Sequence, residues 1–469
     1  MPDSPSAQGA DRWWSARPSW ARGDRLATVC FWVMAAAVLV FLLVIDRNRW
    51  FSADEWQPLV SRTLFGGHGT ASPVPPHNEH WVLIPIVIYR VLFTLFGLRH
   101  HLPYEVVGVL VHLLTVWLLW RFLLRLGVSA WVALASVTAF ALLGAGWENI
   151  TDTFQIAFVL PVAAVFAALL LLPLEGRFSR RDGIVAALLI GAVMCSNVGL
   201  ITVLVAAIVQ LVRRGIRVAA LTVAPVAVIW LIWYARYHSQ LVTAGRLPFR
   251  TAVQRLPAFV WNGLTNPIST TTGLAGVGVV AIVLLVAWAI RRTRLAEPWT
   301  APLALAFAAP VFLALTGIGR VQYGSSYAST PRYAYVALAL LAPLGAMAID
   351  ATLRRAALAP LILVGSAALL VLVGSSQIKD AAGKQTGIEQ ERESRILATA
   401  QLARTPATFL YPVPVPDAIP NLTVPIIHRL DQDGELPVRA VTPSETLTAL
   451  SYLQVLFGPS RRVGGPPRA

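Results

Sequence analysis

The stretch that decides the fold is Ala27–Ile45, ATVCFWVMAAAVLVFLLVI, which is followed within a few residues by Phe51-Ser52-Ala53-Asp54-Glu55-Trp56. The first segment has no charged side chain and is long enough to cross the hydrocarbon core of a bilayer as an α-helix. The second segment places two adjacent carboxylates just beyond the end of that span. Together they predict a membrane protein with an acidic pair near a membrane surface.

The composition of the whole chain indicates the same class. Of 469 residues, 56% are hydrophobic and 13% are charged, which is too apolar for a soluble protein of this length. The formal net charge of +15 comes from arginines that stand between the apolar segments. There they set membrane orientation, so we do not expect nucleic-acid binding. Cys30 and Cys195 lie in apolar segments and predict neither a disulfide framework nor a metal site.

Arginine clusters mark the cytoplasmic side of the membrane. They are Arg121/Arg125, Arg177/Arg180/Arg181, Arg213/Arg214/Arg217, Arg291/Arg292/Arg294 and Arg354/Arg355. The apolar segments between them give a path of about eleven transmembrane helices, with the amino terminus inside and the carboxyl terminus outside. The predicted fold class is an all-α polytopic membrane protein with outer-face surface helices and a small C-terminal extracytoplasmic region.

Two segments need separate interpretation. Gly183–Val212 has arginines at both ends, so we expect a tight helical hairpin with Ser196-Asn197 at its tip and two short arms. His80–Gly97 is apolar enough to span, but crossing would place Arg90 near the bilayer centre at a cost of roughly 3 kcal/mol. We therefore expect this second segment to lie along the outer surface as a helix.

These assignments divide the chain into three regions. Residues 1–25 form a cytoplasmic tail, and residues 26–374 form the transmembrane domain, whose first outer loop covers 46–102. Residues 375–469 form an extracytoplasmic region with a helix at Gln385–Leu402, an extended linker at Pro412–Pro416 and a second helix at Ser444–Phe457. This region is either a small outer domain or a flexible tail.

The acidic pair Asp54-Glu55 is the first candidate for chemistry. A carboxylate at a membrane surface can take a proton from an attacking hydroxyl or hold a divalent cation. The alternative is a solvated loop acid paired with Arg47 or Arg49.

Three further polar clusters fall in predicted outer segments. In the same loop, His77, Glu79 and His80 could bind a metal or hydrogen-bond a sugar or an acceptor. Glu148, Asn149 and Gln155 stand in the next outer turn, where they could line a sugar pocket or simply be turn residues. Asn197 at the hairpin tip could join the site or cap a helix.

Two arginines in the predicted outer loop between 316 and 333 suit a phosphate group. Arg320 and Arg332, the latter followed by Tyr333, offer bidentate donors and permanent charge. The alternative is snorkelling to the interface without a ligand. The sequence has no Walker-type phosphate loop, Rossmann glycine motif or Gly-x-Ser-x-Gly motif, so an outer-face transferase would need a donor that is carried in the membrane.

This layout resembles the GT-C superfamily of polyprenyl-phosphate-sugar-dependent glycosyltransferases. Its members include protein O-mannosyltransferases, lipid A aminoarabinose transferases and actinobacterial cell-wall glycosyltransferases. The features in common are the acidic pair Asp54-Glu55, the surface helix at His80–Gly97, the span that begins near Leu102-Pro103 and the short hairpin. The sequence departs from the superfamily at Pro75–His80, where relatives often have a Lys-Pro-Pro-like stretch.

The resemblance implies an inverting transfer of a sugar from a polyprenyl phosphate to an extracytoplasmic glycan, lipid or protein. Asp54 would be the general base and Glu55 would assist, while Arg320 and Arg332 would hold the departing phosphate. Asp54, Glu55 and His80 could bind a divalent cation, Mg²⁺ or Mn²⁺. Arginine-rich, lysine-poor composition suggests a bacterial source, and therefore the bacterial cytoplasmic membrane with the site on its outer face. The alternatives are a transporter, flippase or ligase for lipid-linked saccharides, or a non-catalytic scaffold.

Overall fold

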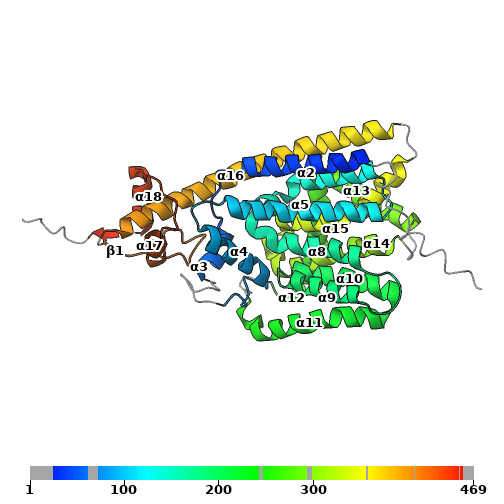
Figure 1. The fold of residues 1–469 in the computed structure, drawn as a ribbon, viewed down its shortest axis with the longest axis horizontal. Helices are drawn as coiled ribbons and strands as arrows, with labels where there is room; N and C mark the ends of the chain where they lie inside the picture. Colours follow the sequence, from blue (N-terminus) through cyan, green and yellow to red (C-terminus); the bar gives the residue numbers. More distant parts are fainter. Residues whose placement is uncertain are drawn as a thin grey trace, which may run out of the picture.

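The computed structural model describes residues 25–61, 72–241, 247–292, 298–354, 358–405, 407–453 and 455–457. All of the predicted cytoplasmic tail except Arg25 lies outside these ranges. The helices of the bundle run along the long axis of the molecule (Figure 1). They are α2 (Arg25–Ile45), α5 (Leu102–Arg125), α6 (Ala130–Ala141), α7 (Trp147–Thr151), α8 (Ile156–Leu171), α9 (Arg180–Val193), α10 (Val198–Arg214), α11 (Ile216–Tyr237), α12 (Phe249–Thr272), α13 (Val277–Arg292), α14 (Thr300–Arg320), α15 (Pro331–Leu353) and α16 (Ala359–Ala403).

Smaller elements gather at one end of the bundle, on the left of Figure 1. They are α3 (Ala53–Ser61), α4 (Leu83–Phe96), α17 (Val424–Gln432), α18 (Pro443–Leu453) and the strands β1 (Ala407–Phe409) and β2 (Val455–Phe457). The two strands pair antiparallel, with Thr408 opposite Leu456. We call this end of the molecule the outer end.

Seven helices of the described chain are long and apolar enough to cross a membrane, or up to nine if each of two bent pairs is one span. The bent pairs are α6 with α7, at 44°, and α12 with α13, at 118°. The chain is therefore a multi-pass, all-α membrane protein, as predicted. The count of eleven is not confirmed, because α9 and α10 are shorter than a full span.

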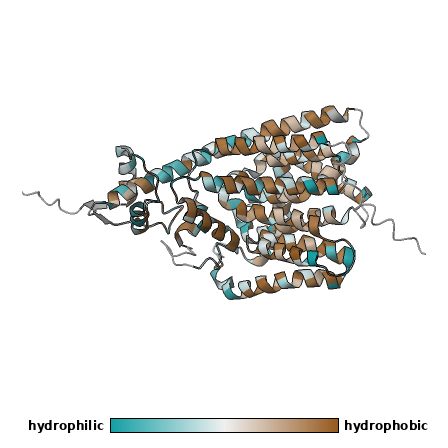
Figure 2. Ribbon diagram, viewed as in Figure 1, coloured by the Kyte–Doolittle hydropathy of each residue, from teal (hydrophilic) through white to brown (hydrophobic). Residues whose placement is uncertain are grey.

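The apolar surface of the bundle supports this conclusion. One large core joins α2, α5, α6, α8, α10, α14 and α15, yet apolar side chains such as Trp32, Ile232 and Ile290 remain exposed. Figure 2 shows hydrophobic residues along almost the whole bundle. An exposed apolar belt of this extent needs lipid to cover it.

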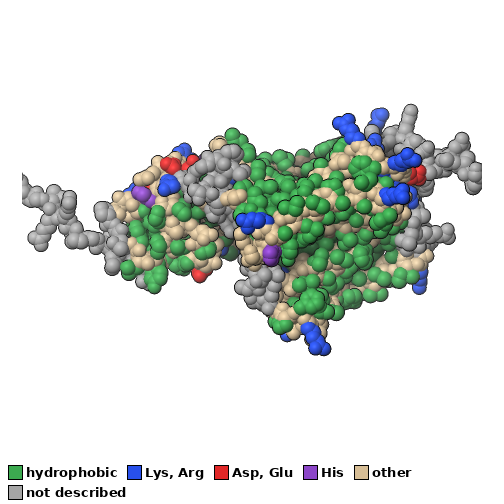
Figure 3. Space-filling view, turned by 90° about the horizontal axis from the view of Figure 1, so that it is seen from below, with side chains coloured by type: hydrophobic (Ala, Val, Ile, Leu, Met, Phe, Trp, Pro, Cys, Tyr) green, Lys and Arg blue, Asp and Glu red, His purple; other side chains and the backbone are tan. Residues whose placement is uncertain are grey.

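Arginines gather at the end of the bundle opposite α3 and α4 (Figure 3). Arg214 donates to the carbonyl of Arg177 at 2.6 Å, and Arg354 donates to the carbonyl of Gly127 at 3.0 Å. Arg125 donates to the carbonyl of Leu169 at 3.3 Å. These contacts bring together the ends of α5, α8, α10 and α15, so Arg125, Arg177, Arg214 and Arg354 share one end of the molecule.

The helix predicted at His80–Gly97 is present as α4, beside α3. Arg90 is 1% exposed and donates a hydrogen bond to the carbonyl of Pro58 in α3. The backbone N–H of Ile84 also donates to the carbonyl of Met194 in the hairpin turn at 3.2 Å. The charge of Arg90 is thus accommodated by packing of α4 on α3.

The C-terminal region is built on one long helix. The end of the predicted transmembrane domain, up to residue 374, and the predicted helix at 385–402 are parts of the single 45-residue helix α16. Beyond the bundle, α17 and α18 pack on its last turns. A second core, which includes Trp56, Ile396 and Ile427, joins the last turns of α16 and α17 to α3 and α4, and α18 packs in a separate core. The described part of this region consists of helices and a two-stranded sheet packed on the end of α16.

Candidate active site

Two adjacent cavities lie at the outer end of the bundle. The first has a volume of about 300 Å³ and is enclosed by α10, α11 and α14. The second is smaller, about 70 Å³, and lies next to α3 and the turn before α8. Both cavities are lined by Glu79, His80, Phe158, Arg320 and Tyr333. These shared residues form the boundary between an apolar and a polar space.

The two acids of the predicted pair have different surroundings. Glu55 is fully buried and accepts hydrogen bonds from the Ser52 N–H at 2.5 Å, the Tyr89 hydroxyl at 2.6 Å and the His101 ring at 2.9 Å. Burial raises the pKa of Glu55, but His101, Tyr89 and Ser52 together lower it below its usual range. Glu55 lines neither cavity, so the structure gives it an anchoring position at the start of α3.

Asp54 is partly exposed and lines the polar cavity. Arg49, considered above as a partner for the acidic pair, instead binds Glu389 with an Nη2–Oε1 distance of 2.7 Å and lies 3.6 Å from Asp46. The carboxylate of Asp54 is therefore presented to the cavity from the first turn of α3, with its neighbour Glu55 fixing that turn.

The loop before α4 reaches the cavities through a tight turn. His77 and His80 exchange backbone hydrogen bonds, each 2.9 Å long, and Asn78 between them has a positive φ of 53°. Asn197 at the hairpin tip donates from Nδ2 to the carbonyl of Glu79 at 2.8 Å, and its backbone N–H donates to Nδ1 of His80 at 3.4 Å. The hairpin tip thus fixes the residues that separate the two cavities.

His80 is held in its neutral form. Burial of the ring, opposed by Glu79 and reinforced by the nearby His77, Arg320 and Arg332, lowers the pKa of His80 to about 4. Because Nδ1 accepts a hydrogen bond, the ring proton belongs on Nε2. A neutral imidazole at this position can donate one hydrogen bond without adding charge.

Two arginine–glutamate pairs supply the charge of the site. Arg320, at the end of α14, donates from Nη2 to Glu79 at 2.7 Å, and Arg332 donates to Glu148. Burial raises the pKa of Glu79, but its bond to Arg320 and the nearby His80 lower it overall. Pro331 at the first position of α15 starts that helix, which places Arg332 in the first turn. Both arginines line the polar cavity.

The structure brings together most of the predicted site residues. Those that line one or both cavities are Asp54, His77, Glu79, His80, Gln155, Asn197, Arg320, Arg332 and Tyr333. Glu148 contacts the site through Arg332. Asn149 is 3% exposed and, like Glu55, lines neither cavity.

The possible metal set of Asp54, Glu55 and His80 is not assembled. Among the described residues, no group of three or more His, Cys, Asp or Glu side chains is placed to hold a metal ion. The oxygens of Glu55 are engaged by Tyr89, His101 and Ser52, away from the polar cavity.

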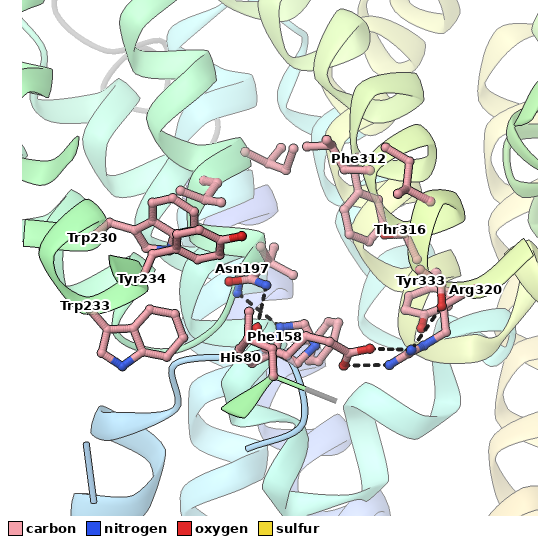
Figure 4. A pocket seen from close by; sticks show the side chains of 18 residues that line it. His80, Phe158, Asn197, Trp230, Trp233, Tyr234, Phe312, Thr316, Arg320 and Tyr333 are labelled. Carbon is pink, nitrogen blue, oxygen red and sulfur yellow. Dashed lines mark hydrogen bonds and ion pairs between the residues drawn. The ribbon is translucent and has the colours of Figure 1, made fainter. Parts of the chain in front are cut away.

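The apolar wall of the larger cavity was not predicted. Trp230, Trp233 and Tyr234 project from the outer end of α11 and face Phe312 on α14 (Figure 4). Trp233 stacks on Trp81 with a ring-centroid distance of 5.3 Å. Trp230, Trp233 and Tyr234 stand at positions i, i+3 and i+4 of one helix, so their common face could have been predicted from the sequence.

The apolar helical bundle defines the class of this protein as a polytopic α-helical membrane protein. An apolar and a polar cavity lie side by side at one end of the bundle. No family model and no curated protein sequence matches the chain.

Two solved structures have a similar fold. The ArnT of Cupriavidus metallidurans in the apo state aligns with a TM-score of 0.53 at 14% identity, over 92% of this chain and 89% of that chain. The same protein bound to undecaprenyl phosphate aligns with a TM-score of 0.50 at 14% identity, over 90% and 88%. ArnT is an aminoarabinose transferase of the GT-C superfamily, so the predicted GT-C fold is confirmed.

Proposed function

We propose that this protein is an integral-membrane glycosyltransferase that moves a sugar from a polyprenyl-phosphate donor to an extracytoplasmic acceptor. The observation that carries the proposal is the meeting of Asp54, Arg320 and Arg332 in one polar cavity beside an apolar one. The likeness in fold to a structure that binds undecaprenyl phosphate supports a carrier lipid of this class. We place the enzyme in the bacterial cytoplasmic membrane with its site on the outer face.

The larger cavity suits the lipid end of the donor. Its aromatic wall of Trp230, Trp233 and Phe312 would cover the first isoprene units, and the rest of the chain would extend into the bilayer. Arg320 stands at the boundary of this cavity. A phosphate held there by guanidinium groups would place the sugar in the polar cavity, opposite Asp54.

The transfer requires one bond to form and one to break. The acceptor oxygen attacks the anomeric carbon, and its proton passes to the carboxylate of Asp54. The bond between that carbon and the phosphate oxygen breaks, and its electron pair leaves with the polyprenyl phosphate. Attack from the opposite face inverts the anomeric centre. Arg320 and Arg332, held in place by Glu79 and Glu148, stabilise the charge that develops on the phosphate.

Transport of a lipid-linked saccharide is the competing function from another class. It predicts polar groups inside the bundle that are available to a substrate. The sequence offers His112 and Asn197 at most. Asn197 donates to the carbonyl of Glu79 at 2.8 Å, and the ring nitrogens of His112 engage the Tyr335 hydroxyl at 3.0 Å and the carbonyl of Ala141 at 3.1 Å. A histidine bonded in this way serves the packing of α5 against α6 and α15, which favours the transferase.

The test is sugar transfer by purified protein in lipid nanodiscs. A panel of labelled polyprenyl-phosphate sugars is supplied with crude cell-envelope acceptor, and nanodiscs without protein are the control. We expect label from one donor to reach the acceptor, with the anomeric configuration of the product opposite to that of the donor. Folded protein that releases label from no donor would contradict the proposal and favour a diphosphate-glycan ligase or a transporter.

A further inference from the structure

A buried carbonyl oxygen on the wall of the polar cavity lacks a hydrogen-bond partner. Gln155 is 2% exposed and lines this cavity, and its Oε1 atom has no partner in the described part of the chain. Leaving a buried amide oxygen unpaired is unfavourable, because the oxygen loses its bond to water. An unpaired oxygen of this kind at a cavity wall is therefore suited to accept a hydrogen bond from an O–H or N–H group of a ligand.

Hydrogen bonds and ring contacts hold the backbone around Gln155 in place. Its N–H donates to the carbonyl of Asp152 at 3.0 Å, and the carboxylate of Asp152 accepts from the N–H of Phe154 at 3.1 Å. The ring of Phe154 packs edge-on against His77 and Tyr89. The turn before α8 is consequently held on both sides, which fixes the backbone of Gln155 beside the cavity.

The groups that share the cavity complement this oxygen. Asp54 on α3 is the acceptor for the proton of the attacking hydroxyl in the proposed reaction. Arg332 has a buried Nε atom that also lacks a partner among the described residues. The lining of this cavity, which has a volume of about 70 Å³, therefore includes two hydrogen-bond acceptors, Asp54 and Gln155, and a donor, Arg332, beside the other polar groups described above.

We propose that Gln155 selects a saccharide acceptor that carries a vicinal diol. One hydroxyl of the diol gives its proton to Asp54, and the neighbouring hydroxyl donates to Oε1 of Gln155. An oxygen of the acceptor accepts from Nε of Arg332. A serine or threonine side chain has a single hydroxyl and would leave Gln155 unpaired. The inference rests on the proposed transferase function and specifies its acceptor.

The first test compares two substitutions of Gln155. Gln155→Met has a similar size but no amide oxygen, and we expect it to raise the KM for the acceptor by about tenfold to hundredfold, with the donor KM unchanged. Gln155→Glu keeps an acceptor oxygen and should recover most of the affinity. Gln210→Met is the matched control, because Gln210 is equally buried with an unpaired Oε1 but lies at the arginine end. An acceptor KM in Gln155→Met equal to that of the control would overturn the inference.

The second test asks what the acceptor is. Crude cell envelope is treated with periodate, which cleaves vicinal diols, or with protease, and each sample is offered to the wild-type protein with its labelled donor. We expect periodate to abolish transfer and protease to leave it intact. Transfer that survives periodate but not protease would show a protein acceptor and would overturn the inference. Absence of transfer to untreated envelope would instead contradict the transferase function itself.

Discussion

At the scale of single residues, the adjacent acids Asp54 and Glu55 have different surroundings. Adjacent residues on a helix point in different directions, so Glu55 turns inward while Asp54 faces the cavity. The pair could be predicted from its place after the first span. The different surroundings of its two members could not be predicted, because they depend on Tyr89 and His101, which stand 34 and 46 positions beyond Glu55 in the chain.

His80 gives a prediction about pH at this scale. Its pKa in the folded protein is about 4, below the usual value of 6.5, so the unfolded chain binds more protons between these two values. Stability should therefore fall as the pH falls from about 6.5 to 4. We expect the decrease in Tm between pH 7 and pH 4.5 to be smaller in His80→Gln than in the wild type.

The control for this measurement is His238→Gln, which changes an exposed histidine. Its Tm should depend on pH as the wild type does. Thermal unfolding in the same detergent at both pH values checks the comparison. Equal decreases in all three proteins would show that His80 is not held neutral by its surroundings.

At the scale of elements, apolar runs and arginine clusters predicted the membrane helices well and their ends poorly. Hydropathy locates the boundary of the membrane, whereas a helix continues until its backbone hydrogen bonds stop. This is why α16 continues past Gly374 into a polar segment without interruption. Helix α12 was missed because Phe249–Thr272 contains Arg250, Arg255 and two prolines, which together resemble an outer loop.

The hairpin of α9 and α10 was predicted correctly, and its close packing makes a testable element. A Cβ atom at Gly199 would lie 2.3 Å from the backbone of Ala192, whereas one at Gly183 would meet nothing within 4 Å. We expect Gly199→Ala to destabilise the protein by roughly 1–3 kcal/mol and to slow transfer, because Asn197 would shift with the tip.

Gly183→Ala is the matched control on the other arm of the same hairpin. It should leave Tm unchanged or raise it slightly, since alanine is favoured over glycine inside a helix. The measurement is thermal unfolding of both variants, followed by their transfer rates. If both variants behave alike, close packing at Gly199 does not position the hairpin tip.

At the scale of the whole molecule, the site lies where the bundle meets the smaller elements at the outer end. Arg49 joins these parts, because its guanidinium binds Glu389 on α16 through two hydrogen bonds and also donates to the carbonyl of Thr151 beside the site. Arg49 and Glu389 are 340 positions apart, so no local pattern could have predicted their contact. Breaking such a buried pair is expected to be strongly destabilising.

The central claim is that Asp54 removes the proton of the acceptor in a cavity that also holds the donor phosphate. The most direct measurement is single-turnover transfer in nanodiscs that contain the donor the wild type uses, with wild type and Asp54→Asn compared. We predict that Asp54→Asn has the same Tm and donor affinity but transfers about 10²- to 10⁴-fold more slowly. Transfer by Asp54→Asn at the wild-type rate would contradict the account.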